Sequence, residues 1–266
     1  MTRTALVTGG SRGLGRAAAL ALAEEGADVV VTYVRDRTSA DEVVALITAA
    51  GGRAAALALD TSAVAFEEFA DALRSVLDGW GAAGLDVLVN NAGVAGHTPF
   101  GSITADDMDA LHAIHVRGPV LLTQALAPLL VDRGHVLNVS TGLTRFTGGS
   151  AYSVYAAMKG AVEVWTRYLA KELGPRGIAV NSIAPGATAT DFGGGVIRDD
   201  ERYRTMIAGV SADGSRGRAD GRRARRRGDH VAVDVLGHRP AHRGLGRPVP
   251  LTPPPATQRL LRPPTR

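Results

Sequence analysis

The chain has 266 residues, of which 45% are hydrophobic, and this is enough apolar material for one large α/β domain or two small ones. It has no cysteine, which excludes disulfides and thiolate chemistry. No apolar run approaches the roughly 20 residues of a membrane span, and the first residues enter a strand pattern without a signal peptide. We therefore expect a cytoplasmic protein.

The formal net charge of +4 conceals two regions of opposite sign. Residues 211–266 contain 13 arginines, 4 aspartates and no lysine, whereas residues 1–210 contain 17 basic and 22 acidic residues. The body therefore carries a net charge of about −5 and the tail one of about +9. An asymmetry of this size indicates that the two regions need separate explanations.

Short apolar runs alternate with helix-length segments through most of the body. We predict strands at 3–8, 28–33, 53–59, 85–90, 135–140 and 177–183. We predict helices at 13–25, 39–50, 63–78, 104–130 and 151–173. Strands joined by helices form right-handed βαβ units, so the predicted fold class is α/β, with a doubly wound parallel sheet covered on both faces.

A glycine-rich turn follows the first predicted strand and opens a helix. Glycines let the backbone turn tightly and approach a pyrophosphate at the positive helix N-terminus, so the turn predicts a nucleotide-binding loop. A plain structural turn is the alternative. The candidate cofactor-binding residues in this turn are Gly9, Ser11, Arg12, Gly13, Leu14 and Gly15.

Polar and small residues follow the third, fourth and sixth predicted strands. Asp60 can either hydrogen-bond an adenine amine or cap the next helix. The segment that begins at Asn90 either allows a ring to approach closely or forms an Asx-type turn. The cofactor-binding candidates at these strand ends are Asp60, Thr61, Asn90, Ala92, Gly93, Pro185, Gly186, Thr188 and Thr190.

Tyr155 and Lys159 are four residues apart on a predicted helix, so their side chains share one face. An ammonium beside a phenol favours the phenolate and lowers the pKa of the tyrosine, although a pair with this spacing is usually structural when taken alone. Ser140 and Thr141 end the fifth strand, where a hydroxyl can hydrogen-bond a substrate oxygen.

Taken together, the segments TGGSRGLG, NNAG, NVST, YAAMK and APGATAT, with Asp60, resemble the short-chain dehydrogenase/reductase family, including its 3-oxoacyl reductases, over residues 1–192. The resemblance implies a Rossmann-type domain and hydride transfer between a nicotinamide cofactor and a carbonyl or alcohol substrate. It also implies that Tyr155 is the general acid/base and that Lys159 lowers its pKa and binds the nicotinamide ribose. The strand-end hydroxyl would polarise the carbonyl, and Pro185-Gly186 would contact the nicotinamide.

The choice of cofactor depends on the end of the second strand. An acid there binds the ribose 2′-hydroxyl of NAD(H), whereas arginine suits the 2′-phosphate of NADP(H). Here the strand ends at Tyr33 and Arg35 follows, while Arg12 lies in the glycine turn. We therefore predict NADP(H), with NAD(H) as the alternative. Arg35 and Arg37 could instead be solvated surface residues.

Two positions depart from the family pattern. His115 stands where the family commonly has an asparagine that holds a water in a proton relay, so it is either a working substitute or a damaged relay. Counting back from Tyr155 at the family's spacing reaches Gly142, which has no hydroxyl. The motif therefore favours Thr141 as the catalytic hydroxyl, with one residue inserted in the following loop, and Ser140 is the alternative.

Residues 193–210 are expected to form a substrate lid, and the resemblance fades after about Val210. Residues 211–266 hold 8 of the 13 prolines, so we predict a disordered tail in which the family's seventh strand is missing or altered. The absence of lysine favours a changed reading frame in GC-rich DNA near 205–215. The alternatives are a genuine tail and an arginine-rich arm that binds nucleic acid.

The sequence therefore predicts an NADP(H)-dependent oxidoreductase that acts on a small carbonyl or alcohol substrate. The alternative is a catalytically impaired NADP-binding relative, disabled by the change at His115 and by the altered tail. We expect no metal, no membrane and no nucleic acid as partners. The identity of the substrate and the choice between a tetramer and a smaller assembly stay open.

Overall fold

The computed structural model describes residues 2–63, 65–147, 151–190, 192 and 199, and the backbone of 217–218. The chain divides into two compact units, Met1–Val235 and Leu236–Arg266, and all the described residues belong to the first. The predicted lid, apart from Asp199, and nearly all of the predicted tail lie outside the described residues. Within them, no helix is both long and apolar enough to cross a membrane.

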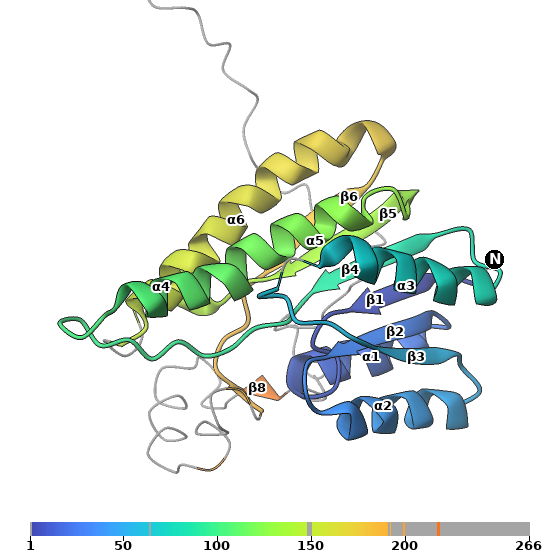
Figure 1. The fold of residues 1–266 in the computed structure, drawn as a ribbon, viewed down its shortest axis with the longest axis horizontal. Coiled ribbons are helices and arrows are strands. Elements are labelled where there is room, and N and C mark those ends of the chain that lie inside the picture. The colour runs from blue at the N-terminus through green and yellow to red at the C-terminus, as the bar shows by residue number, and fades with distance from the viewer. Residues whose placement is uncertain are drawn as a thin grey trace, which may run out of the picture. The chain divides into compact units, whose positions relative to one another are not determined.

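Six strands form one parallel sheet in the order β3-β2-β1-β4-β5-β6 (Figure 1). β1 is buried at all its positions and β2 at all but the last, as expected for strands covered on both faces. The predicted parallel α/β fold is confirmed. The strands are β1 (Thr4–Val7), β2 (Asp28–Tyr33), β3 (Ala54–Ala58), β4 (Leu85–Asn90), β5 (Leu130–Val139) and β6 (Ala179–Ile183).

The helices fall into two groups. α1 (Gly13–Glu24) packs on α2 (Arg37–Ala49), and α3 (Phe66–Gly79) packs on α5 (Gly118–Leu126), whereas α6 (Ser153–Leu173) contacts β6 (Figure 1). Because parallel crossovers are right-handed, the first pair covers one face of the sheet and the later helices cover the other. The strand order reverses between β1 and β4, and the carboxyl ends of the strands at such a point usually line a ligand crevice.

The predicted continuous helix at 104–130 is wrong in its form and its extent. The segment contains α4 (Ala105–His112), a π-helical turn η1 (Ala113–Arg117) and α5, which ends at Leu126. The polypeptide then enters β5 at Leu130, where the register against β4 shifts. Arg133 adopts a left-handed conformation with φ 64° in this irregular part, and no periodic pattern reveals such a residue.

Leucines from α3 and α5 fill the space beneath the centre of the sheet. Leu73, Leu122 and Leu126 have no accessible surface and belong to the same cluster as Leu88 of β4. Burial of each such side chain stabilises the fold by about 1.5–3 kcal/mol. This packing fixes the carboxyl ends of β4 and β5, on which the polar residues of the candidate site are carried.

A second sheet has two short parallel strands, β7 (Thr188–Ala189) and β8 (Gly217–Arg218). β8 belongs to the arginine-rich region, for which the sequence patterns predicted no strand at this place. The pairing brings the backbone of this region beside the segment that follows β6. The altered reading frame lies outside the described residues and stays a prediction.

Candidate active site

The turn after β1 depends on glycines at three positions. Gly9 and Gly13 have φ angles of 61° and 57°, in the left-handed region that favours glycine. A Cβ on Gly15 would lie 2.3 Å from the carbonyl oxygen of Gly9. The predicted loop therefore has a backbone path that residues with side chains cannot follow.

Three polar residues that the sequence analysis did not single out fix this turn. The hydroxyl of Thr8 accepts hydrogen bonds from the backbone N–H groups of Asn91 and Ala92, at 2.9 and 3.0 Å. The amide of Asn91 donates to the carbonyl oxygen of Thr8 at 2.8 Å, and Thr32 accepts from the N–H of Gly9 at 3.1 Å. Thr8 and Asn91 lie within the segments TGGSRGLG and NNAG, whereas Thr32 has no signal beyond its place near the end of β2.

The N-terminus of α1 is open to an anion. Its N-cap residue, Arg12, is extended and makes no capping hydrogen bond with its side chain. The first N–H groups of a helix have no partners within the helix and carry a partial positive charge. Together with the close backbone approach that Gly9 and Gly13 allow, this arrangement fits the pyrophosphate of a dinucleotide. Ser11 and Leu14 are half-buried in the same turn.

Arg12 also lies near the end of β2, as a 2′-phosphate site requires. Hydrogen bonds from Ser39 hold the pKa of Asp36 below its ordinary value, and the charge of Arg12 adds to this effect. Asp36 is occupied as the N-cap of α2, where it accepts a hydrogen bond from the Ser39 N–H at 3.0 Å. The carboxylate is therefore engaged by a helix end, whereas Arg12 is exposed.

Arg35 and Arg37 have different surroundings. Arg35 is close enough to Asp60 for its charge to help lower the pKa of that carboxyl. Arg37 instead forms an exposed ion pair with Asp41 at 3.3 Å, one turn along α2. Of the two arginines, only Arg35 is directed by a described interaction toward the strand ends.

Asp60 does not cap the next helix, so that alternative is wrong. The residue before α3 is Ala65, and the Asp60 carboxylate accepts hydrogen bonds from the N–H and hydroxyl of Ser62 at 2.9 and 2.6 Å. These bonds hold the pKa of Asp60 below its ordinary value. Thr61 is buried next to it.

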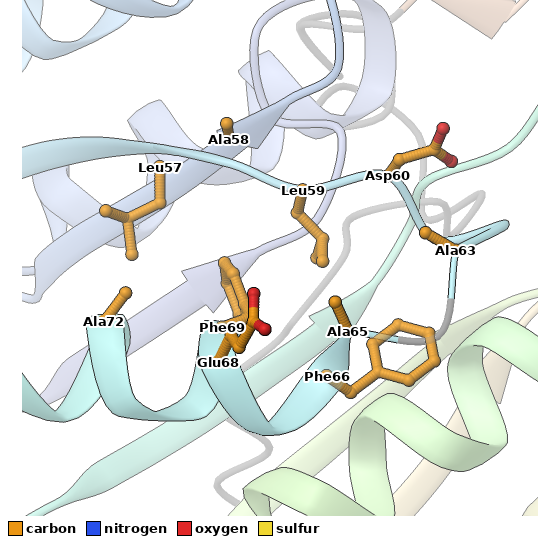
Figure 2. A pocket seen from close by; sticks show the side chains of 10 residues that line it. All are labelled: Leu57, Ala58, Leu59, Asp60, Ala63, Ala65, Phe66, Glu68, Phe69 and Ala72. Carbon is orange, nitrogen blue, oxygen red and sulfur yellow. The ribbon is translucent and has the colours of Figure 1, made fainter.

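A pocket of about 310 Å³ lies between the end of β3 and α3. Figure 2 shows Leu59 directed toward the phenylalanines Phe66 and Phe69, while the carboxylate of Asp60 points away from them. The Asp60 carboxylate therefore lies just beyond the carboxyl end of β3 and points away from the apolar part of this pocket.

Asn90 is a structural residue in the described fold. Its amide donates to Asn138 at 2.8 Å and to Thr123 at 3.0 Å, and Asn138 in turn donates to Thr166 at 2.9 Å. All four residues are buried, and they connect β4, β5, α5 and α6. The amide group of Asn90 is thus directed into the protein.

Ala92 and Gly93 follow the two asparagines. Ala92 lies against the glycine turn, and Gly93 lies against His115. A Cβ on Gly9 would lie 3.1 Å from the Cα of Ala92, so these two segments are in close contact. A Cβ on Gly93 would lie 2.8 Å from Cε1 of His115. Ala92 and Gly93 therefore leave room along this edge that larger residues would remove.

Tyr155, Lys159 and Thr141 come together beside the end of β5. Burial raises the pKa of Tyr155 to about 12, and a hydrogen bond from Thr141 opposes this rise. Burial lowers the pKa of Lys159 to about 8, and its ammonium donates to the carbonyl oxygen of Val139 at 2.7 Å. The expected lowering of the tyrosine pKa by Lys159 is not seen, because burial dominates and the ammonium is directed to the Val139 carbonyl.

Ser140 and Thr141, the two candidates for the catalytic hydroxyl, point in different directions. The hydroxyl of Ser140 is buried and donates to the Glu163 carboxylate at 2.7 Å. Thr141 instead lies close enough to Tyr155 for its hydroxyl to oppose the rise in the pKa of the tyrosine. Ser140 is thus directed toward α6, and Thr141 is directed toward the tyrosine.

His115 lies in the π-helical turn η1, and such turns are frequent at functional sites. Burial, helped by the charge of Lys159, lowers its pKa to about 3, so the ring is neutral. Nε2 lies 3.0 Å from the Val94 carbonyl oxygen and must carry the proton there, while the buried Nδ1 has no partner among the described residues. The ring also contacts Tyr155 edge-to-face at 5.2 Å between centroids.

The segment after β6 lies over the glycine turn. A Cβ on Gly13 would contact Thr190 at 3.4 Å, and Phe192 lies 6.2 Å from Tyr155 between ring centroids. Pro185 accepts a hydrogen bond from the N–H of Gly142 at 2.8 Å. This segment, with Gly186 and Thr188, therefore connects the nucleotide end of the site to the tyrosine end.

This arrangement defines a dinucleotide-binding α/β protein with a tyrosine–lysine oxidoreductase site. The model of the short chain dehydrogenase family matches residues 3–201, and the chain belongs to that family. It is accordingly an NAD(P)-dependent oxidoreductase. Among the described residues, no group of three or more histidine, aspartate or glutamate side chains could hold a metal ion.

Known proteins resemble both the sequence and the structure. A 3-oxoacyl-[acyl-carrier-protein] reductase from Synechocystis is 39% identical over 192 residues, 71% of this chain and 76% of the relative. A short chain dehydrogenase from Burkholderia cenocepacia, solved with NADP, is 39% identical with a TM-score of 0.74, over 82% of this chain and 86% of the other. The landomycin C-6 ketoreductase LanV, solved with NADP and rabelomycin, is 33% identical with a TM-score of 0.73, over 82% and 84%.

Proposed function

We propose that this protein is an NADPH-dependent reductase that converts a ketone to a secondary alcohol. The observation that supports this most directly is the position of the Thr141 hydroxyl near the buried Tyr155, with Lys159 one turn along α6. The glycine turn lies at the same edge of the sheet. The NADP-bound relatives add support for the cofactor.

When bound, the nicotinamide cofactor supplies a hydride to the carbonyl carbon. Thr141 would hydrogen-bond the carbonyl oxygen, which stabilises the negative charge that develops there. Tyr155 would donate its phenolic proton to that oxygen. Lys159 would bind the nicotinamide ribose, and neutral His115 contacts the ring of Tyr155 edge-to-face.

The protonation state of Tyr155 favours reduction. With its pKa raised to about 12, the phenol keeps its proton at neutral pH and can give it to an alkoxide, which is a stronger base. Alcohol oxidation needs the phenolate, so we expect that reaction to accelerate as the pH rises toward 10. The impaired-enzyme alternative predicts NADPH binding without turnover in either direction.

The preference for NADPH is tested by fluorescence titration of the full-length chain with NADPH and with NADH. We expect tighter binding of NADPH, and we expect Arg12→Ala and Arg35→Ala each to weaken NADPH binding about tenfold while leaving NADH unchanged. Arg37→Ala is the matched control, because Arg37 is engaged with Asp41. Equal affinity for the two cofactors would contradict the proposed preference.

Phe192, which lies beside Tyr155, and other aromatic side chains in the same part of the chain's fold support a flat aromatic ketone as the substrate. Phe192 and Phe146 are 43% and 55% exposed, and His97 packs edge-to-face on Tyr152 at 5.7 Å between centroids. Such rings bind polycyclic aromatic molecules by stacking and burial of apolar surface. The relative that was solved with rabelomycin supports this class, whereas the Synechocystis relative supports a 3-oxoacyl thioester.

Steady-state NADPH oxidation with rabelomycin and with acetoacetyl thioester separates these two classes. We expect a kcat/KM for rabelomycin at least tenfold higher, and we expect Phe192→Ala to lower it while leaving the thioester reaction unchanged. Val164→Ala, at an exposed apolar residue on α6, is the control. A higher kcat/KM for the thioester would reject the aromatic substrate class.

A further inference from the structure

Glu163 lies on α6 one turn beyond Lys159 and two turns beyond Tyr155, so the three residues share one helical face. One of its carboxylate oxygens, Oε1, accepts hydrogen bonds from the hydroxyls of Ser140 and Thr144, at 2.7 and 2.8 Å. Hydrogen bonds to a carboxylate are about twice as strong as bonds between neutral groups. A single atom therefore holds two points of the loop that follows β5.

Thr141 lies between these two points. On its N-terminal side, the N–H of Ser140 donates to Ile183 at 2.7 Å, and on its C-terminal side the N–H of Gly142 donates to Pro185 at 2.8 Å. These backbone bonds attach the loop to β6 and its extension. The bonds to Glu163 attach the same loop to α6, the helix that carries Tyr155.

The relative position of Thr141 and Tyr155 therefore depends on how the loop is tied to α6. Lys159 provides one tie through the carbonyl oxygen of Val139 at 2.7 Å, and Glu163 provides the second through Ser140 and Thr144. The two residues that Glu163 binds, Ser140 and Thr144, lie on either side of Thr141 in the chain. A displacement of about 1 Å between reacting groups can lower a rate about a hundredfold.

We propose that Glu163 is a positioning residue, which holds the 140–144 loop against α6 so that the hydroxyl of Thr141 meets Tyr155 and the substrate oxygen. The proposal rests on the proposed ketone reduction, in which Thr141 and Tyr155 touch the substrate. It also explains the orientation of Ser140, whose hydroxyl donates to Glu163 and so holds the loop instead of binding the substrate.

The test compares Glu163→Gln with Glu163→Met. Glutamine keeps an oxygen acceptor for the two hydroxyls and should retain at least a third of the wild-type kcat. Methionine keeps the length and removes the acceptor, and we expect kcat to fall about 10- to 100-fold while the Kd for NADPH is unchanged. Glu172→Met, at an exposed carboxylate on the same helix, should leave kcat unchanged.

A double-mutant cycle with Thr141→Ala separates positioning from a general structural role. If Glu163 acts through Thr141, Glu163→Met should cause less than a twofold further loss of kcat in the Thr141→Ala protein. An equal loss in both backgrounds, or a parallel loss of NADPH affinity, would overturn the proposal. If Glu163→Met does not fold, Thr144→Val removes one of the donors at nearly constant volume and should give a smaller loss in the same cycle.

Crystal structures of the wild type and of Glu163→Met provide a readout that needs no substrate. The proposal expects the distance between the Thr141 and Tyr155 hydroxyls to be longer in the variant than in the wild type. An unchanged distance would contradict it, even if the wild type reduced no ketone. Wild-type turnover, measured first, tests the proposed function separately from the role of Glu163.

Discussion

Replacing Lys159 by methionine should make the protein more stable at pH 7 and much less active. Burial lowers the pKa of Lys159 from 10.5 to about 8, so at pH 7 the folded protein carries a buried ammonium at a cost of about 3 kcal/mol. Methionine removes that cost, but it also leaves the carbonyl oxygen of Val139 without its donor, which costs about 1–3 kcal/mol. The net expectation is a gain of about 1 kcal/mol at pH 7.

The same substitution should change the dependence of stability on pH. Because the folded pKa of Lys159 is lowered, the unfolded chain binds the proton more tightly between pH 8 and 10.5, and the wild type gains stability as the pH rises through this range. From pH 7 to 9.5 the gain is about 2 kcal/mol, and the methionine variant lacks it. The variant should therefore be the less stable protein at pH 9.5.

Urea unfolding monitored by circular dichroism at pH 7 and pH 9.5 measures this crossover. Turnover should fall by about 10²- to 10⁴-fold, as expected when proton transfer is impaired. A stability difference between the two proteins that stays constant from pH 7 to 9.5 would show that Lys159 is not buried as an ammonium, and the reasoning would fail.

Three further tests, at Gly15, His115 and Asn138, concern other parts of the site. Gly15→Ala should abolish NADPH binding because its Cβ would lie 2.3 Å from the Gly9 carbonyl oxygen. Gly160→Ala is the control, since no atom lies within 4 Å of the new Cβ. It should leave NADPH binding intact and raise the free energy of unfolding in urea by about 0.5–1 kcal/mol. In the wild type, the pKa of His115 is lowered to about 3 by burial, so between pH 7 and 5 the histidine takes up a proton in the unfolded chain but not in the folded protein. This difference should lower the free energy of unfolding of the wild type by about 2 kcal/mol. The His115→Asn variant should lack this loss. A parallel pH dependence of the two proteins would contradict a buried neutral ring. Asn138→Leu should lower the free energy of unfolding by about 2–4 kcal/mol, because it strips the partner from a buried amide, and a loss below about 1 kcal/mol would reject that account.

The sequence was most informative where a local pattern determines the structure. The alternation of apolar runs and helical segments predicted all six strands of the main sheet, because strands covered on both faces must be nearly continuous in apolar residues. The glycine turn was equally readable, since Gly9 and Gly13 adopt left-handed conformations that other residues avoid. These features depend on neighbours in the sequence.

Features that depend on distant contacts were not predictable. Glu163 lies on a helix where a carboxylate is usually solvated, and only the fold brings it to Ser140 and Thr144. The pKa of Tyr155 depends on how deeply the ring is buried, so the spacing to Lys159 gave the wrong direction. The π-helical turn around His115 has no periodic signal of its own.

The buried amides of Asn90 and Asn138 lie opposite each other in the pairing of β4 with β5. If one strand slid by two residues, its apolar side chains would still face the core, but Asn138 would lie opposite Leu88 or Ala92 and the bond between the two amides would be lost. The hydrogen bond between the two amides therefore favours one register of β4 against β5 over registers with the same pattern of apolar side chains. Because Gly93, three residues after β4, lies against His115, and Thr141 follows β5 by two residues, the alignment of these two strands also sets the spacing of the two proposed site residues His115 and Thr141.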